Sequence, residues 1–179
     1  MIIKRLALVL LLVWGCSFTG PLLRPNKGYV EFIARADIMV EKNFPEWYVD
    51  GTPYIINLEE TEHLAATFVY RNGVFSIVLY KDALNFTLVE DLATTLLHEH
   101  VHVKTWDYLK ETIPGKLCNN AVSELMAYGV ELEQTKIQVS QTMRDSTQFW
   151  YEEYYLYGSV VCPAEIIKDF PNPFMLNNN

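Results

Sequence analysis

The stretch that could carry out chemistry reads His-Glu-His-Val-His at residues 98 to 102. On a helix, His98 and His102 are four residues apart and project from one face, so both imidazoles can reach one metal ion. Zinc binds neutral imidazole nitrogen at about 2.0–2.1 Å, and a catalytic zinc keeps a position open for water. Glu99 is rotated by about 100°, which places its carboxylate beside the metal. The spacing predicts two zinc ligands and a general base.

His100 stands between the two predicted ligands. In a helix it points about 100° away from either neighbour and cannot share their metal. We therefore predict that His100 is a structural or exposed histidine. The pattern H-E-x-x-H arises by chance in roughly 1% of chains of this length, so a solvent-facing His/Glu helix surface is the alternative interpretation.

The third ligand must come from elsewhere in the chain. A third histidine in the spacing H-E-x-x-H-x-x-G-x-x-H is excluded, because Thr105 and Tyr108 occupy the Gly and His positions. The other common arrangement places a glutamate on the following helix. Glu124, 22 residues after His102, fits it best. The alternatives that remain open are Glu131, Glu133 and Asp107.

The two segments together resemble the gluzincin class of zinc metallopeptidases. The resemblance rests on His98-Glu-His-Val-His102 and on Ser123-Glu124-Leu-Met-Ala127-Tyr128, and with the hairpin it covers mainly residues 67 to 131. In that class a small residue stands three positions after the glutamate ligand, as Ala127 does here. An aspartate often stands four positions after it and bonds a zinc-bound histidine; this chain has Tyr128.

The resemblance implies zinc-dependent hydrolysis of peptide bonds, with Glu99 activating the water. It also implies that an extended substrate pairs with the strand before the active-site helix, here Val74 to Tyr80. A hydrogen-bond donor to the oxyanion is needed as well. The sequence leaves several candidates for it: Tyr151, Tyr154, Tyr155, Tyr157 and His63.

The elements that must position these residues indicate a small α+β domain of zincin type. Apolar residues recur at a helical period over residues 29–43, and Tyr54 to Leu58 reads as a strand. Asn72-Gly73 lies between two strand-like runs and predicts a type I′ hairpin.

The helices on which the ligands lie follow the hairpin. Thr87 and Glu90 match a capping box that would open a helix over about 88–110, ended by Pro114-Gly115. A second helix, from Asn119 or Asn120, would carry the third ligand, and a tyrosine-rich segment follows it.

The N-terminus indicates export. Lys4 and Arg5 precede the apolar run Leu6 to Trp14, which is about half the length of a membrane-spanning helix and typical of a signal peptide. The run ends in Val-Trp-Gly-Cys and resembles a bacterial lipobox, with Cys16 as the lipidated residue. We predict a signal peptide at 1–15, a tether at 16–28 and one domain at 29–179. An ordinary secretory signal is the alternative.

Composition and charge narrow the class further. The chain of 179 residues is half apolar and carries a net charge of −8 with no basic block, so neither nucleic acid nor an anionic membrane surface is indicated as a partner. Cys118 and Cys162 remain as an even pair in an oxidising compartment, and we predict that they form a disulfide. Two independent buried thiols are the alternative.

The function expected from the sequence is a zinc metallopeptidase of the bacterial cell envelope, anchored to the membrane by an N-terminal lipid. Its substrates would be exported or cell-envelope proteins or peptides. The competing hypothesis is a non-catalytic zinc-binding lipoprotein that binds a partner protein. Glu99 argues against it, because a purely structural zinc site does not use an acid at that position.

Overall fold

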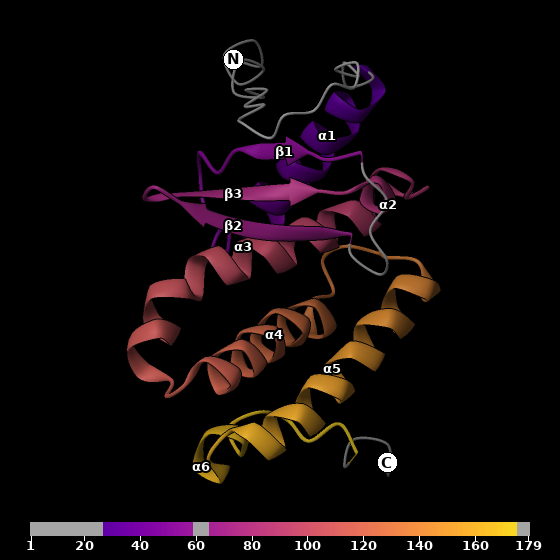
Figure 1. Ribbon diagram of the computed structural model, residues 1–179. Coiled ribbons are helices and arrows are strands. Elements are labelled where there is room, and N and C mark those ends of the chain that lie inside the picture. The colour runs from indigo at the N-terminus through magenta and orange to yellow at the C-terminus, as the bar shows by residue number, and fades with distance from the viewer. Residues whose placement is uncertain (1–26, 59–64, 175–179) are drawn as a thin grey trace.

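The computed structural model describes residues 27–58 and 65–174, and it shows an α+β fold. A small three-stranded sheet lies on one side of a long central helix, α3, and two further helices lie on its other side (Figure 1). The strands are β1 (Tyr54–Ile56), β2 (Ala66–Arg71) and β3 (Val74–Leu79). The helices are α1 (Lys27–Asn43), α2 (Lys81–Leu84), α3 (Val89–Thr112), α4 (Lys116–Glu133), α5 (Gln141–Val161) and α6 (Ala164–Ile167).

The predicted hairpin is confirmed. β2 and β3 pair antiparallel with Arg71 opposite Val74, and the two turn residues have positive φ: 53° at Asn72 and 81° at Gly73. A type I′ turn needs positive φ at both central residues, which Asn and Gly adopt at the lowest cost.

A substrate can pair with Val74 to Tyr80, as the resemblance implied, only if this strand is a sheet edge, and that prediction is wrong. The strand order is β1-β3-β2, with β1 parallel to β3, so β3 is central and β2 is an edge strand. The sequence of β3 fits this position, because Ile77 and Leu79 are completely buried. Among the described residues, the strand beside α3 with an unpaired edge is therefore β2.

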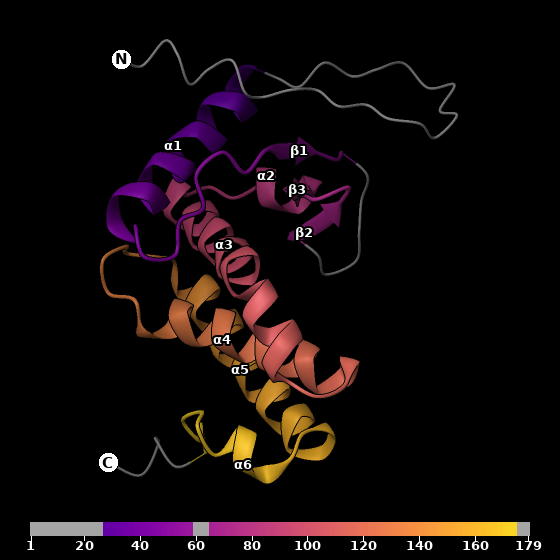
Figure 2. The same cartoon turned by 90° about the vertical axis from the view of Figure 1, so that its left-hand side faces the viewer.

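α3 is the central element of the domain. It contacts α1, β2, β3 and α4, and Figure 2 shows α1 and the sheet on one side of it. Helix α3 is therefore buried around most of its circumference, and the fully buried side chains include Leu92, Leu96, Leu97 and Val101. Such a helix can hold polar side chains in a dry setting only if they are paired.

The ends of α3 differ in detail from the prediction. The helix starts at Val89, with Leu88 as N-cap and no side-chain cap. The predicted cap by Thr87 is wrong, because Thr87 lies one residue outside the position that a capping box requires. At the other end Ile113 precedes Pro114, and Gly115 has φ 76°. This turn sends α4 back along α3, starting at Lys116, three residues before the predicted Asn119.

The tyrosine-rich segment belongs to α5, which packs against α4. Cys118 in the first turn of α4 and Cys162 directly after α5 form the predicted disulfide, with a Cα–Cα distance of 4.8 Å. The bridge joins the start of α4 to the end of α5, beside the apolar side chains of Leu109 and Val122.

The predicted signal peptide, Cys16 and nearly all of the predicted tether lie outside the described residues. The first described helix, α1, begins at Lys27, two residues before the predicted start. Within residues 27–58 and 65–174, none of the helices combines the length and the apolarity needed to cross a membrane.

Candidate metal centre

Three side chains converge between α3 and α4. His98 and His102 lie one turn apart on α3, and their Nε2 atoms are 2.9 Å from each other. Oε2 of Glu124, on α4, is 3.3 Å from the first and 3.6 Å from the second. The three could hold a metal ion, since one donor atom from each lies within 4.8 Å of the others. The residues predicted from the sequence are thus brought together.

Each histidine is oriented by a hydrogen bond at its other nitrogen. Nδ1 of His98 is 2.6 Å from Oε1 of Glu131, and Nδ1 of His102 is 2.7 Å from the hydroxyl of Ser123. Glu131 is fixed in turn, because Thr147 on α5 donates a hydrogen bond of 2.8 Å to its Oε2. Such partners fix the ring and its tautomer, so that Nε2 presents a lone pair toward the centre.

Glu131 was an alternative candidate for the third metal ligand, but the structure gives it another position. It lies at the outer nitrogen of His98 and not with the converging atoms, so it orients a ligand. Tyr128 packs its ring against His98, with 4.4 Å between centroids. Of the remaining alternatives, Glu133 and Asp107 are exposed and outside the cluster.

The carboxylates around His98 and His102 favour a positive charge between them. Burial alone would raise the pKa of Glu124, but its bonds to His102 and His98 lower that pKa to about 2. Burial would lower the pKa of His98, yet the contacts with Glu124 and Glu131 raise it above its usual value. Without a metal ion, a proton on the imidazole supplies the positive charge that the two carboxylates favour.

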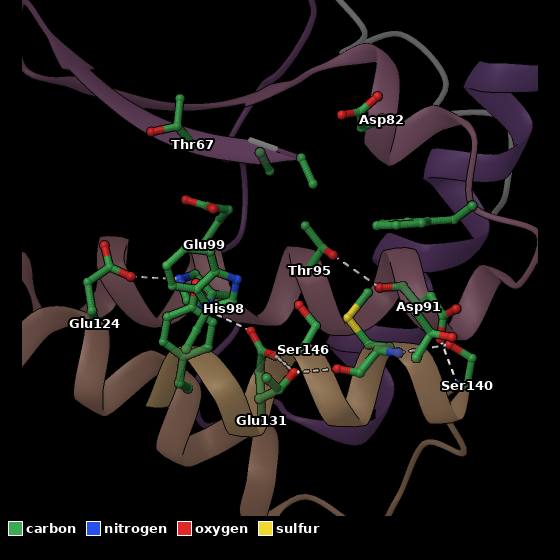
Figure 3. A pocket seen from close by; sticks show the side chains of 18 of the residues that line it. Thr67, Asp82, Asp91, Thr95, His98, Glu99, Glu124, Glu131, Ser140 and Ser146 are labelled. Atoms are coloured by element: carbon green, nitrogen blue, oxygen red, sulfur yellow. Dashed lines mark hydrogen bonds and ion pairs between the residues drawn. The ribbon is translucent and has the colours of Figure 1, made fainter. Parts of the chain in front are cut away.

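Glu99 is buried, and one of its two carboxylate oxygens lacks a hydrogen-bond partner among the described residues. Its side chain is 5% exposed, and Oε2 has no hydrogen-bond partner within the described parts of the chain. Burial raises the pKa of Glu99, and the nearby His98 and His102 only partly offset this. In Figure 3 its carboxylate points to the side of β2, away from the ring of His98. A buried carboxylate oxygen without a partner is costly, which makes Glu99 a candidate functional residue.

His100 is structural, as predicted. It is fully buried, and Nδ1 accepts a hydrogen bond of 3.2 Å from the backbone N–H of Val49. Nε2 then carries the proton and donates it to the hydroxyl of Tyr54 at 3.0 Å. That hydroxyl donates to Asp37 on α1 at 2.5 Å. The chain of bonds ties α3 to β1 and α1, and burial lowers the pKa of His100 to about 4.

A cavity of about 680 Å³ opens beside the cluster. Its walls come from the start of β2, the segment between β3 and α3, and one face each of α3, α4 and α5. Of the tyrosines predicted as oxyanion donors, only Tyr154 lines it; Tyr151 is buried and donates to the carbonyl of Pro171. Tyr128 also lines the cavity, although the sequence did not suggest it as a donor. His63 lies outside the described residues.

One contact has no counterpart in the sequence predictions. Phe68 of β2 lies over His102, with 5.2 Å between ring centroids, and also contacts Trp106. Both faces of the hairpin are largely apolar, so the sequence indicates a covering helix but does not show that Phe68 packs against the helix with the predicted ligands.

No protein-family model, curated protein sequence or solved structure gave a significant match to this chain.

Proposed function

We propose that this protein is a zinc metallopeptidase, with His98, His102 and Glu124 as zinc ligands and Glu99 as general base. The observation that supports this most strongly is the combination of three converging donor atoms with a buried carboxylate oxygen, Oε2 of Glu99, that has no hydrogen-bond partner among the described residues.

The donor set fits zinc. A tetrahedral zinc with bonds of about 2.0–2.1 Å holds its ligand atoms about 3.3–3.4 Å apart. The separations among the two Nε2 atoms and Oε2 of Glu124 are 2.9, 3.3 and 3.6 Å, which bracket that value. Two imidazoles and one carboxylate are also a ligand set of catalytic zinc sites, in which a fourth position stays open. When bound, zinc polarises a carbonyl group and makes water acidic near neutral pH.

Glu99 is suited to proton transfer. A general base works best when its pKa lies near the working pH, and burial moves the pKa of this carboxyl upward. Glu99 would take a proton from the attacking water and deliver it to the nitrogen of the leaving amine. The water oxygen forms the new bond to the carbonyl carbon, and the C–N bond breaks.

The free edge of β2 is suited to hold an extended peptide. Tyr80 N–H bonds the carbonyl of Ala65, so Ala65 and Tyr80 form a hydrogen-bonded pair of the antiparallel ladder. Hydrogen-bonded and non-bonded pairs alternate, which turns the backbone groups of Ala66, Phe68 and Tyr70 outward. A substrate strand paired there lies along the cavity that contains Glu99.

The place of action belongs to the same proposal. A signal peptide and lipidation at Cys16 would put the enzyme in the bacterial cell envelope, where exported proteins or peptides are the available substrates. The disulfide between Cys118 and Cys162 supports an oxidising compartment.

The test is hydrolysis of a peptide mixture by the purified domain, measured by mass spectrometry. The zinc-loaded protein should cleave peptide bonds, a chelator should stop cleavage, and added zinc should restore it. Glu99→Gln should bind as much zinc as the wild type and lose activity by at least about 100-fold. Full activity of Glu99→Gln at equal zinc content contradicts the proposal.

A second candidate, a non-catalytic zinc-binding protein that docks a partner, has one observation in its favour. α5 exposes an apolar stripe of large side chains: Phe149, Trp150, Leu156, Tyr157 and Val160, the last of them 83% exposed. Such a surface is typical of protein contacts. Zinc binding without cleavage of any peptide favours this candidate.

A further inference from the structure

We propose that an aromatic patch beside His102 binds a large apolar side chain of the substrate, about three residues before the cleaved bond. The aromatic patch consists of the rings of Phe68, Tyr70, Phe75 and Trp106. The inference rests on the proposed function, since it takes the substrate to be a peptide strand paired with the unpaired edge of β2.

The aromatic patch borders the candidate metal centre. Phe68 lies over His102, with 5.2 Å between ring centroids, and its ring is 5.4 Å from that of Trp106. Trp106 follows His102 by about one turn of α3. The ring of Tyr70, on the same face of β2 as Phe68, is 6.0 Å from the Trp106 ring. The rings therefore form a continuous apolar surface that leads from a proposed zinc ligand toward the Arg71 end of β2.

Part of the aromatic patch is open to solvent. The side chain of Tyr70 is 50% exposed, and that of Val74, at the same end of the hairpin, is 55% exposed. Phe68, Phe75 and Trp106 are partly buried, and none of them belongs to a core cluster of the described residues. Large rings that stay accessible beside a cavity are typical of a surface that contacts a ligand.

The position of Phe75 shows how a large side chain packs beside Tyr70. The two residues are opposite each other in the β2–β3 ladder, and their ring centroids are 4.6 Å apart. On the outer side of Tyr70, no described strand pairs with β2. A substrate strand paired there places one residue opposite Tyr70, with its side chain on the same face and its Cβ about 4.5–5.5 Å away. Its side chain then covers the exposed part of Tyr70, as Phe75 covers the inner part.

The direction of pairing places this residue before the cleaved bond. Antiparallel pairing is slightly more stable per residue than parallel pairing, and a substrate antiparallel to β2 runs from the Arg71 end to the Ala66 end. In Figure 3 the carboxylate of Glu99 points toward the part of β2 that carries Thr67. Tyr70 lies three residues, about 10 Å, further along the strand. The substrate residue opposite Tyr70 is thus about three residues N-terminal to the bond beside Glu99.

The aromatic patch favours a large apolar side chain over a small or a charged one. An aromatic or long aliphatic side chain removes its own area and that of Tyr70 from water, whereas alanine is too short to do so. A carboxylate would lose hydration against ring faces that carry partial negative charge. An ammonium group is attracted to such faces, but at an exposed site this attraction is weaker than the gain from burying an aromatic side chain.

Peptide binding to zinc-loaded Glu99→Gln tests the selection without turnover. The probes are an alanine heptapeptide and its variants with one Phe, one Lys or one Glu. The Phe peptide should bind about tenfold more tightly than the other three. With Tyr70→Ala added, this advantage should fall to about twofold, because the Trp106 ring remains. Tyr70→Phe, which keeps the ring, should retain the full advantage.

Tyr108→Ala is the matched control for Tyr70→Ala. Tyr108 is a tyrosine of α3 that is 61% exposed and does not belong to the aromatic patch, so its loss should leave the advantage of the Phe peptide unchanged. Two results overturn the inference: alanine, Lys or Glu peptides that bind as tightly as the Phe peptide, or an advantage that Tyr70→Ala does not reduce.

The cleavage products of a peptide mixture separate failure of this inference from failure of the proposed function. The wild type should cut where a large apolar residue stands about three residues before the cleaved bond. Cleavage without that enrichment leaves the peptidase intact and contradicts the substrate contact. Binding that prefers the Phe peptide and depends on Tyr70, without any cleavage, supports the aromatic patch as a peptide contact and contradicts the peptidase.

Discussion

The two histidines of the candidate metal centre, His98 and His102, are oriented by hydrogen bonds of unequal strength. His98 bonds a carboxylate at 2.6 Å, whereas His102 bonds a hydroxyl at 2.7 Å. A hydrogen bond to an ionised acceptor is roughly twice as strong as a neutral one. Glu131 should therefore contribute more to metal binding than Ser123.

Replacing Glu131 by glutamine should weaken zinc binding by about 10–100-fold, because an amide cannot give His98 the same charge support. The affinity can be measured by competition with a chromogenic chelator. Glu133→Gln, two positions on and exposed, is the control and should keep the wild-type affinity. An unchanged affinity in Glu131→Gln would show that the bond to His98 does not matter for the metal.

The buried His100 should make stability depend on pH. Its folded-state pKa is about 4, against an ordinary value of 6.5, so the unfolded chain binds the proton first. The stability that the neutral ring provides is complete above pH 6.5 and is lost as pH falls toward 4. The loss amounts to about 3 kcal/mol.

His100→Asn should flatten this pH dependence, since the amide oxygen can still accept from Val49 N–H but does not titrate. Urea unfolding of both zinc-loaded proteins between about pH 4 and 7 measures it. Equal slopes for the two proteins would show that His100 is not the group responsible.

The sequence allowed some residue roles to be predicted and not others. His98, Glu99 and His102 follow from helical geometry within one short stretch, and Glu124 follows from a loop short enough to reverse the chain. The orienting role of Glu131 depends on which side of the imidazole ring α4 approaches and on Thr147, which α5 contributes. No local pattern records such a contact.

At the scale of elements, the strand order could not be predicted from local sequence patterns. The turn Asn72-Gly73 specifies the hairpin, but the hairpin alone leaves either of its strands free to be the edge. β1 decides this by pairing with β3, although it lies well upstream in the chain. The sheet edge beside α3 is therefore β2, and not β3 as the sequence predicted.

Proline substitutions should distinguish the two sides of β2. Tyr70 N–H faces the free edge and Val69 N–H faces β3, because the ladder alternates from the Ala65–Tyr80 pair. Tyr70→Pro should raise KM for peptides several-fold while the melting temperature falls less than in Val69→Pro. Tyr70→Ala controls for loss of the ring. A KM in Tyr70→Pro equal to that of Tyr70→Ala would contradict pairing at this edge.

The disulfide should stabilise the α4–α5 layer. Cys118 and Cys162 are 44 residues apart, and the loop entropy removed from the unfolded chain corresponds to roughly 4 kcal/mol. The double variant Cys118→Ser/Cys162→Ser should lose about 2–4 kcal/mol of unfolding free energy, measured in urea. A loss below about 0.5 kcal/mol would mean that the bridge contributes little.

At the scale of the whole molecule, α3 lies between two layers that supply different parts of the site. The sheet gives a free strand edge and the ring of Phe68, while α4 and α5 give Glu124, Glu131 and Thr147 (Figure 1). The α+β class and the helices could be predicted from periodicity and turn residues. The cavity could not be predicted from the sequence. It depends on how the segment before α3 and the start of α5 are placed around His98, His102 and Glu124.

The central claim is that His98, His102 and Glu124 bind a catalytic zinc, and the metal content of the purified protein tests it most directly. After dialysis with zinc and removal of the excess, wild type and Glu99→Gln should each hold about one zinc ion per chain, and Glu124→Gln should hold almost none. A wild type without zinc, or Glu124→Gln with full stoichiometry, would contradict the account.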